Sequence, residues 1–104
     1  EFIVGNYMDA DIGFGADDFM GSDSANNLIY IYNGDVIDEG TGGAPGYEEN
    51  PPAVGIVSLN HTMNVGGYYD NSGGPYGDPS SAADYWSYMN GNWLNGLSIQ
   101  YGGN

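Results

Sequence analysis

The chain of 104 residues contains no Lys and no Arg, although it contains 14 Asp and Glu residues. Ordinary proteins carry about 25% charged residues of both signs, so a chain without basic side chains is unusual. Apart from His61 and the N-terminal amine, no cation of the chain is available to a carboxylate. The carboxylates must therefore stay solvated, accept hydrogen bonds from backbone N–H groups, or bind metal cations.

Three further features are missing, and each excludes a class of protein. With a formal charge of −14 and no basic residue, the chain is a poor partner for nucleic acids and for anionic membrane surfaces. Without Cys it has neither disulfides nor a thiolate metal site. No apolar run approaches the length of about 20 residues that a membrane-spanning helix needs, so we expect no membrane insertion.

The residues that are present predict one mainly β domain over 1–104. Hydrophobic residues make up 40% of the chain and aromatic residues 14%, which is enough for one core. Nineteen Gly and five Pro indicate many turns and short strands. We expect β-sandwich-like antiparallel sheets with one short helix. The chain begins in strand-like residues and ends without a structural stop, which predicts a fragment of a longer secreted chain.

Strand patterns occur at 2–8, 27–32, 53–59 and 63–69, whereas 9–24 is typical of an ordered loop. The segment 53–59 is continuously apolar except for Gly55 and Ser58, which favours a strand buried on both faces. Asn33-Gly34, between apolar runs, predicts a hairpin that continues into 35–38, because both residues tolerate the positive φ of a type I′ turn.

One helix is predicted at about 79–90, with Ala82, Tyr85, Trp86 and Met89 on one face. Its N-cap is either Asp78, followed by Pro79, or Ser81, with Asp84 completing a capping box. Gly91 stands where a left-handed residue ends a helix. A further hairpin is expected about Asn95-Gly96.

The carboxylates are concentrated in the first 39 residues, which hold nine of the 14. Calcium takes six to eight oxygen ligands from carboxylates, carbonyls and amides, and a loop rich in Asp and Gly offers them. The candidate calcium ligands are Asp9, Asp11, Asp17, Asp18 and Asp23. One His and no Cys disfavour transition metals.

Two alternatives to this site remain open. Asp and Gly also favour solvated turns that bind nothing. A second acidic group at Asp35, Asp38 and Glu39 either completes the same site or is a solvated strand end. The spacing differs from that of an EF-hand, because no helix pair and no bidentate Glu at the twelfth loop position are present.

Nothing in the sequence indicates an enzyme. The chain has no nucleophile elbow, no zinc-protease motif and no phosphate-binding loop. His61 is the only imidazole, and a local hydrogen bond in a loop accounts for it. We therefore expect no catalytic residue and no organic cofactor.

Several short segments stand in one order along the chain, at 9–13, 17–23, 30–35, 50–55, 68–71, 84–93 and 101–104. In that order they resemble a β-rich module of large secreted and cell-surface proteins of Bacteroidota exported by the type IX secretion system. The chain departs from that module at Ser22, where Cys is usual, and in 89–97, where neutral residues replace basic ones. The departures put in doubt any salt bridge that the relatives make there.

The resemblance implies a non-catalytic, extracellular module. Ser24, in Asp23-Ser24-Ala25, looks like the O-glycosylation site used in this phylum. We expect a calcium-stabilised structural or adhesive module; the alternatives are an accessory domain of a secreted hydrolase and a subunit of an extracellular filament. The partners would be other extracellular proteins, glycans or copies of the chain itself.

Overall fold

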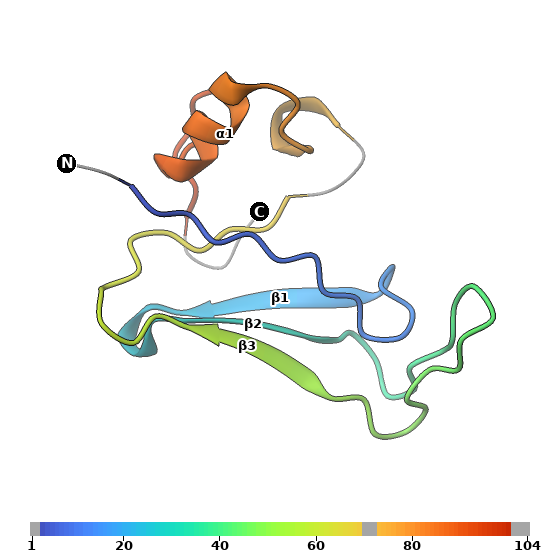
Figure 1. The fold of residues 1–104 in the computed structure, drawn as a ribbon. Coiled ribbons are helices and arrows are strands. Elements are labelled where there is room, and N and C mark those ends of the chain that lie inside the picture. Colours follow the sequence, from blue (N-terminus) through green and yellow to red (C-terminus); the bar gives the residue numbers. More distant parts are fainter. Residues whose placement is uncertain (1–2, 70–72, 101–104) are drawn as a thin grey trace.

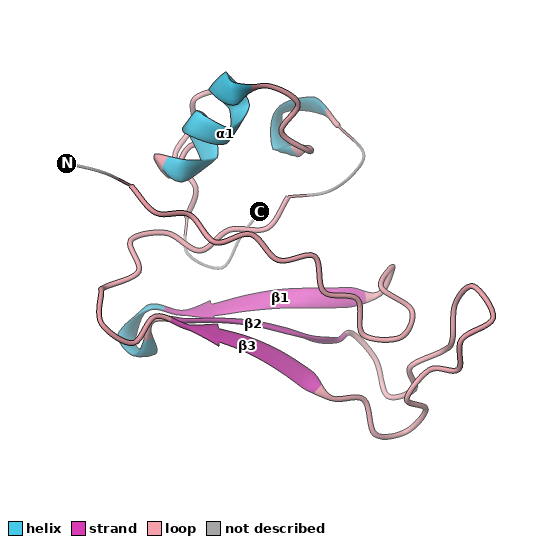
Figure 2. Cartoon of the chain, viewed as in Figure 1, coloured by secondary structure: helices cyan, strands magenta, loops and turns pink. Residues whose placement is uncertain are grey.

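The computed structural model describes residues 3–69 and 73–100, in which one three-stranded antiparallel sheet is accompanied by one α-helix (Figure 2). The sheet has the order β1-β2-β3, formed by β1 Asp18–Asp23, β2 Leu28–Asn33 and β3 Ala53–Val57, and the helix is α1 Ala82–Met89. The predicted mainly β class with one short helix is confirmed at this level. Within the described residues no helix is long and apolar enough to cross a membrane.

A tight connection sets β1 beside β2. A single 3-10 turn, Ser24–Asn26, follows β1, and the Asp23 side chain caps it by accepting hydrogen bonds from Ala25 N and Asn26 N. Asn27 then takes a left-handed conformation with φ of 52°. The chain thus reverses, and Asp23 pairs with Leu28 at one end of the ladder while Asp18 pairs with Asn33 at the other. The prediction of loop throughout 9–24 is therefore wrong for Asp18–Asp23.

The predicted strand 27–32 is confirmed as β2, but the predicted hairpin at Asn33-Gly34 is wrong. Neither residue has a positive φ. The chain leaves the sheet after Asn33 and returns at β3, which pairs with the other edge of β2. In the intervening loop, Asp38 forms a single bridge with Glu48.

The segment 53–59 does not form a strand buried on both faces. Along β3 the exposed positions alternate with half-buried ones, because only one face of the sheet is covered. The predicted strands at 2–8 and 63–69 are absent from the described residues 3–8 and 63–69. These two segments run instead as extended chains across the covered face, between the sheet and α1 (Figure 1).

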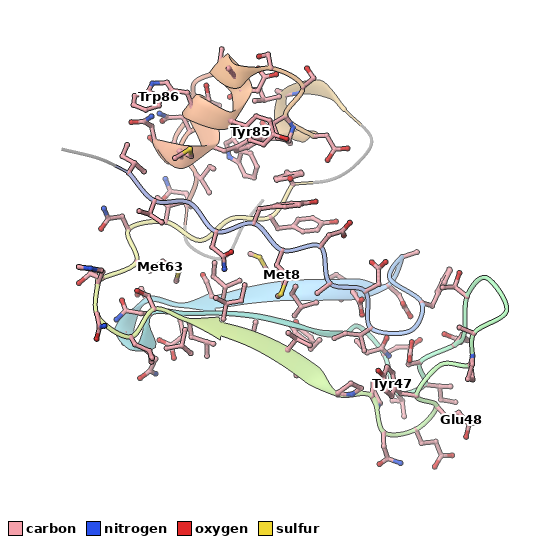
Figure 3. All side chains as sticks on the ribbon, in the orientation of Figure 1. Met8, Tyr47, Glu48, Met63, Tyr85 and Trp86 are labelled. Atoms are coloured by element: carbon pink, nitrogen blue, oxygen red, sulfur yellow. The ribbon has the colours of Figure 1, made fainter. Side chains whose placement is uncertain are left out.

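The covering segments approach closely where glycines allow it. A Cβ on Gly66 would meet the side chain of Ile29 in β2, and one on Gly67 would meet Ile99. Met8 and Met63 lie between these segments and the sheet (Figure 3). The most buried apolar side chains of the described residues are Ile12, Trp93 and Ile99, so the core lies within this layered arrangement.

An aromatic cluster joins the extended segments to α1. Tyr7 stacks on Tyr69 with ring centroids 5.7 Å apart, and Tyr69 stacks on Tyr88 of α1 at 5.1 Å. Trp93 meets Tyr88 and Tyr76 edge-on. Burial raises the pKa of Tyr69 far above its ordinary value, and that of Tyr88 in the same direction, so both rings stay neutral at physiological pH.

The helix begins after Ser81 and not at 79. Ser81 is the N-cap, and the capping box with Asp84 forms, so of the two predicted caps the second is confirmed. Gly91, with φ of 72°, follows the helix as predicted. Around Asn95-Gly96 the chain makes a tight turn closed by the single bridge between Asn92 and Ser98, in place of a longer hairpin.

Candidate cation site at the end of the sheet

Asp38 is the most buried carboxylate described, with 1% of its surface exposed. One carboxylate oxygen accepts a hydrogen bond from Phe14 N at 2.9 Å, and the other accepts one from Tyr47 N at 2.6 Å. Its backbone exchanges two hydrogen bonds with Glu48. Asp38 therefore ties the loop around Phe14 to the loop around Tyr47, and the prediction of a solvated strand end is wrong for this residue.

A glycine makes room for the Asp38 carboxylate. A Cβ on Gly13, whose φ is 65°, would overlap both carboxylate oxygens. The positive φ and the absent side chain together let the 12–14 backbone turn its N–H toward Asp38. The sequence supplies no cation for Asp38, and backbone N–H groups take that place.

Asp18, the first residue of β1, ties the preceding loop 11–17 to the strand. One of its oxygens accepts a hydrogen bond from Ile12 N at 2.7 Å. Ile12 is 2% exposed, so this bond fixes the backbone of a residue that belongs to the core. The other oxygen of Asp18 is shielded from solvent and has no hydrogen-bond partner in the described part of the chain.

Asp18 is not the only side chain here with an unpartnered buried oxygen. Among the residues described, Oδ1 of Asp17 and Oδ1 of Asn33 are also buried without a partner, as is the hydroxyl oxygen of Ser22. Asn33 is only 7% exposed, and its amide nitrogen is directed at Asp35. An oxygen that is shielded from water and accepts no hydrogen bond destabilises the folded state unless a hydrogen-bond donor or a cation binds to it.

The sheet register brings Asp18 and Asn33 side by side. Asp18 and Asn33 are directly opposite in the β1–β2 ladder. Opposite residues project from the same face, with their Cβ atoms about 4.5–5.5 Å apart. A Cβ on Gly34 would meet the carbonyl oxygen of Asp17, so the Asp17 backbone lies against the residue that follows Asn33. One end of the sheet thus gathers acceptor oxygens from two strands.

The charged side chains at this end of the sheet are all negative. Burial raises the pKa of the Asp18 carboxyl, the Ile12 N–H partly offsets that rise, and the charges of Asp17, Asp11 and Asp38 raise the pKa further. With no Lys or Arg in the chain, the repulsion has no internal counter-charge. Protonation of Asp18 or binding of a cation would relieve it.

Of the five predicted ligands, the structure groups three and places Asp23 and Asp9 apart from them. Asp11, Asp17 and Asp18 interact, and the Asp11 carboxylate lies against Gly15. Asp23 is at the far end of β1, five residues or about 16 Å from Asp18, with its oxygens engaged in capping Ser24–Asn26. Asp9 is exposed. Ser24, the predicted glycosylation residue, is exposed in the 3-10 turn.

Comparison of the chain with protein-family models, with curated proteins and with solved structures gives no match. The function is therefore inferred from the chemistry of the site itself. The sequence pattern indicated Asp11, Asp17 and Asp18 and offered Asp38 as a possible fourth carboxylate of the site. It did not indicate Asn33, because Asn33-Gly34 is a turn signal. Asn33 could be recognised only from the strand register, which places it opposite Asp18.

The residues meet some but not all requirements of a metal site. In the described ranges, no three His, Cys, Asp or Glu side chains are arranged so that they hold a metal ion. A ligand set must therefore include other oxygens besides two carboxylates, such as the Asn33 amide or backbone carbonyls. Such a mixed oxygen set is what calcium accepts and what Zn²⁺ does not prefer.

Proposed function

We propose that the chain is a non-catalytic, calcium-stabilised structural or adhesive module of a secreted or surface-displayed bacterial protein. The observation that carries the proposal is the set of buried, unpartnered oxygens of Asp17, Asp18 and Asn33 in a chain without basic residues. Calcium fits because it binds hard oxygen ligands in flexible geometry. Asp11 and Asp38 add negative charge around the site without having to bind the ion directly.

The mechanism is local stabilisation. Calcium at Asp17, Asp18 and Asn33 would neutralise the repulsion that raises the pKa of Asp18. It would also pin the 11–17 loop to the end of the β1–β2 ladder. In this proposal the module is sandwich-like, and the extended segments 3–8 and 63–69 take the position of a second layer (Figure 1). The resemblance to surface modules of Bacteroidota supports an extracellular setting, where calcium is abundant.

Thermal unfolding in calcium and in chelator tests the proposal. Extracellular modules bind calcium with dissociation constants of about 10⁻⁴–10⁻³ M, so about 10 mM calcium should stabilise the fold by roughly 1.4–2.7 kcal/mol. For a chain of this size that corresponds to a rise in Tm of about 7–14 °C. Sodium chloride at matched ionic strength should give a smaller rise. Equal rises in calcium and sodium would show general screening and no site.

A pair of variants with the same charge change localises the site. Asp17→Asn should remove most of the calcium-specific rise in Tm, because a buried ligand oxygen loses its charge. Asp9→Asn should leave the rise intact, because Asp9 is exposed outside the cluster. In chelator, Asp17→Asn should be at least as stable as the parent chain, since it reduces repulsion on Asp18. If both variants respond alike to calcium, the site lies elsewhere.

The sheet edge favours a second candidate, a subunit of an extracellular filament. In the described part of the chain β3 pairs with β2 only, so its other edge is available to a strand of another copy. Light scattering over a range of protein concentrations tests this candidate. Growth of long assemblies would favour it, and a monomer at all concentrations would exclude it for this chain alone.

A further inference from the structure

The face of the sheet opposite the extended segments carries three exposed aromatic rings. Phe19 of β1 and Tyr30 and Tyr32 of β2 are 57%, 37% and 41% exposed. Register places them on one face, since Phe19 pairs with Tyr32 and Gly21 pairs with Tyr30. We call these three side chains the aromatic platform. It is separate from the cation site, whose Asp18 and Asn33 lie on the other face.

Two rings of the platform, those of Phe19 and Tyr30, lie across the sheet and do not stand away from it. A Cβ on Gly21 would run into the Tyr30 ring, and a Cβ on Gly34 would run into the Phe19 ring. The Tyr30 and Phe19 rings therefore each cover a glycine, and all three rings remain partly exposed. The ring centroids are 6.2 Å apart between Phe19 and Tyr32 and 5.9 Å apart between Tyr32 and Tyr30, with interplanar angles of 32°.

The neighbouring strand leaves space over the platform. Tyr30 and Tyr32 pair with Gly55 and Ala53 of β3, whose side chains are absent or small. A ligand that lies along β2 would therefore meet ring faces with little obstruction from β3. An extended peptide segment fits this shallow surface better than a bulky folded domain does.

Charge selects the kind of ligand. The face of an aromatic ring is the negative part of its quadrupole and attracts cations. Asp35, the residue after Gly34, and Asp23, two residues beyond Gly21, add negative charge at the two ends of the platform. The whole chain carries −14 and no Lys or Arg, so it repels nucleic acids and acidic glycans, which also stack on rings.

We propose that the aromatic platform binds an extended basic segment of another protein, with arginines at alternate positions. Alternate residues of an extended chain are about 6.6–6.8 Å apart, close to the separations of the three rings. A guanidinium stacks flat on an aromatic face and still offers N–H groups at its edge to a carboxylate such as that of Asp35. A Lys ammonium has no plane to stack, so arginine is the preferred cation.

Titrations with short peptides, followed by NMR of the aromatic side chains, test this inference. The probes are Arg-Gly-Arg-Gly-Arg and Lys-Gly-Lys-Gly-Lys, both with blocked ends, and a neutral cellulose oligosaccharide. We expect the arginine peptide to bind several-fold more tightly than the lysine peptide, with shifts concentrated on Phe19, Tyr30 and Tyr32. The measurements are made in calcium and in chelator, because the platform requires no metal. Failure of the calcium proposal would then leave this result unchanged.

The variant Phe19→Leu/Tyr32→Leu retains apolar cover over the sheet and removes two ring faces. It should weaken the arginine peptide by about 5- to 30-fold, from the usual strength of two exposed cation–π contacts. The control Tyr85→Leu/Trp86→Leu removes two exposed rings on α1 and should change nothing (Figure 3).

Three results of the affinity measurements would overturn the inference. They are equal affinity of the double variant and the parent chain, equal affinity for the two peptides, and binding of the neutral sugar without binding of the arginine peptide. If the double variant does not fold, the location of the shifts in the parent chain decides. Shifts that spread over the acidic surface and miss the platform would also refute the proposal.

Discussion

Replacement of Asp38 by Asn tests whether a buried carboxylate organises the loops at the end of the sheet. The change preserves the shape of the side chain. In the structure, the two carboxylate oxygens accept hydrogen bonds from Phe14 N and Tyr47 N. Because an amide has only one oxygen, one of these N–H groups would face an NH₂ group. That donor would then be buried without an acceptor.

Two opposing effects set the size of the loss. A hydrogen bond to a charged group contributes about 1.5–3 kcal/mol, and a buried donor left without a partner costs about 1–3 kcal/mol. Removal of the charge also relieves repulsion on Asp18, by an amount on the order of 1 kcal/mol for partly solvated charges. The hydrogen bonds outweigh the repulsion. We expect Asp38→Asn to lower the free energy of unfolding by about 2–4 kcal/mol, a large share of the 5–15 kcal/mol usual for a domain.

Urea unfolding, followed by tryptophan fluorescence and by circular dichroism, measures the loss. Glu39→Gln is the matched control, because it removes one charge from the adjacent, exposed residue. It should change the stability by less than about 0.5 kcal/mol. If Asp38→Asn and Glu39→Gln were equally stable, the carboxylate would not be holding the two loops together, and the reasoning from its burial would fail.

Two further predictions concern the same end of the molecule. The raised pKa of Asp18 means that its ionised form destabilises the folded state, so in chelator the stability should increase as the pH falls from about 7 through the folded pKa of Asp18. Hydrogen bonds hold the pKa values of Asp23 and Asp84 below the usual range, so at lower pH the stability should decrease again as these two groups become protonated. A stability that falls steadily from pH 7 downward would contradict the prediction. Gly13→Ala should destabilise the fold by clearly more than Gly42→Ala, because φ is 65° and 60° at the two positions but only the Gly13 methyl would overlap Asp38. Chemical unfolding of the two variants measures the difference, and equal losses would show that backbone strain alone matters.

Some of the candidate site was visible in the sequence because it depends on composition and local spacing. The absence of basic residues and the crowding of Asp11, Asp17 and Asp18 predict mutual repulsion without any knowledge of the fold. Asp38 and Asn33 were different. Their local surroundings are typical of a turn, and only the pairing of β2 with β1 and the return of the chain at Glu48 bury them.

By itself, the sequence determined the elements that neighbouring residues control. The strand at β2 follows from its β-branched and aromatic side chains, and α1 follows from the Ser81–Asp84 capping box and from Gly91. The tertiary structure decided which segments pair. The Asn33-Gly34 sequence favours a local hairpin, but β2 forms its ladders with β1 and β3 instead. It also decided that Phe19, Tyr30 and Tyr32 face solvent while Ile29 is covered. The physical reason is that pairing and burial depend on contacts between residues far apart in the chain, and local propensity does not encode which of those contacts form.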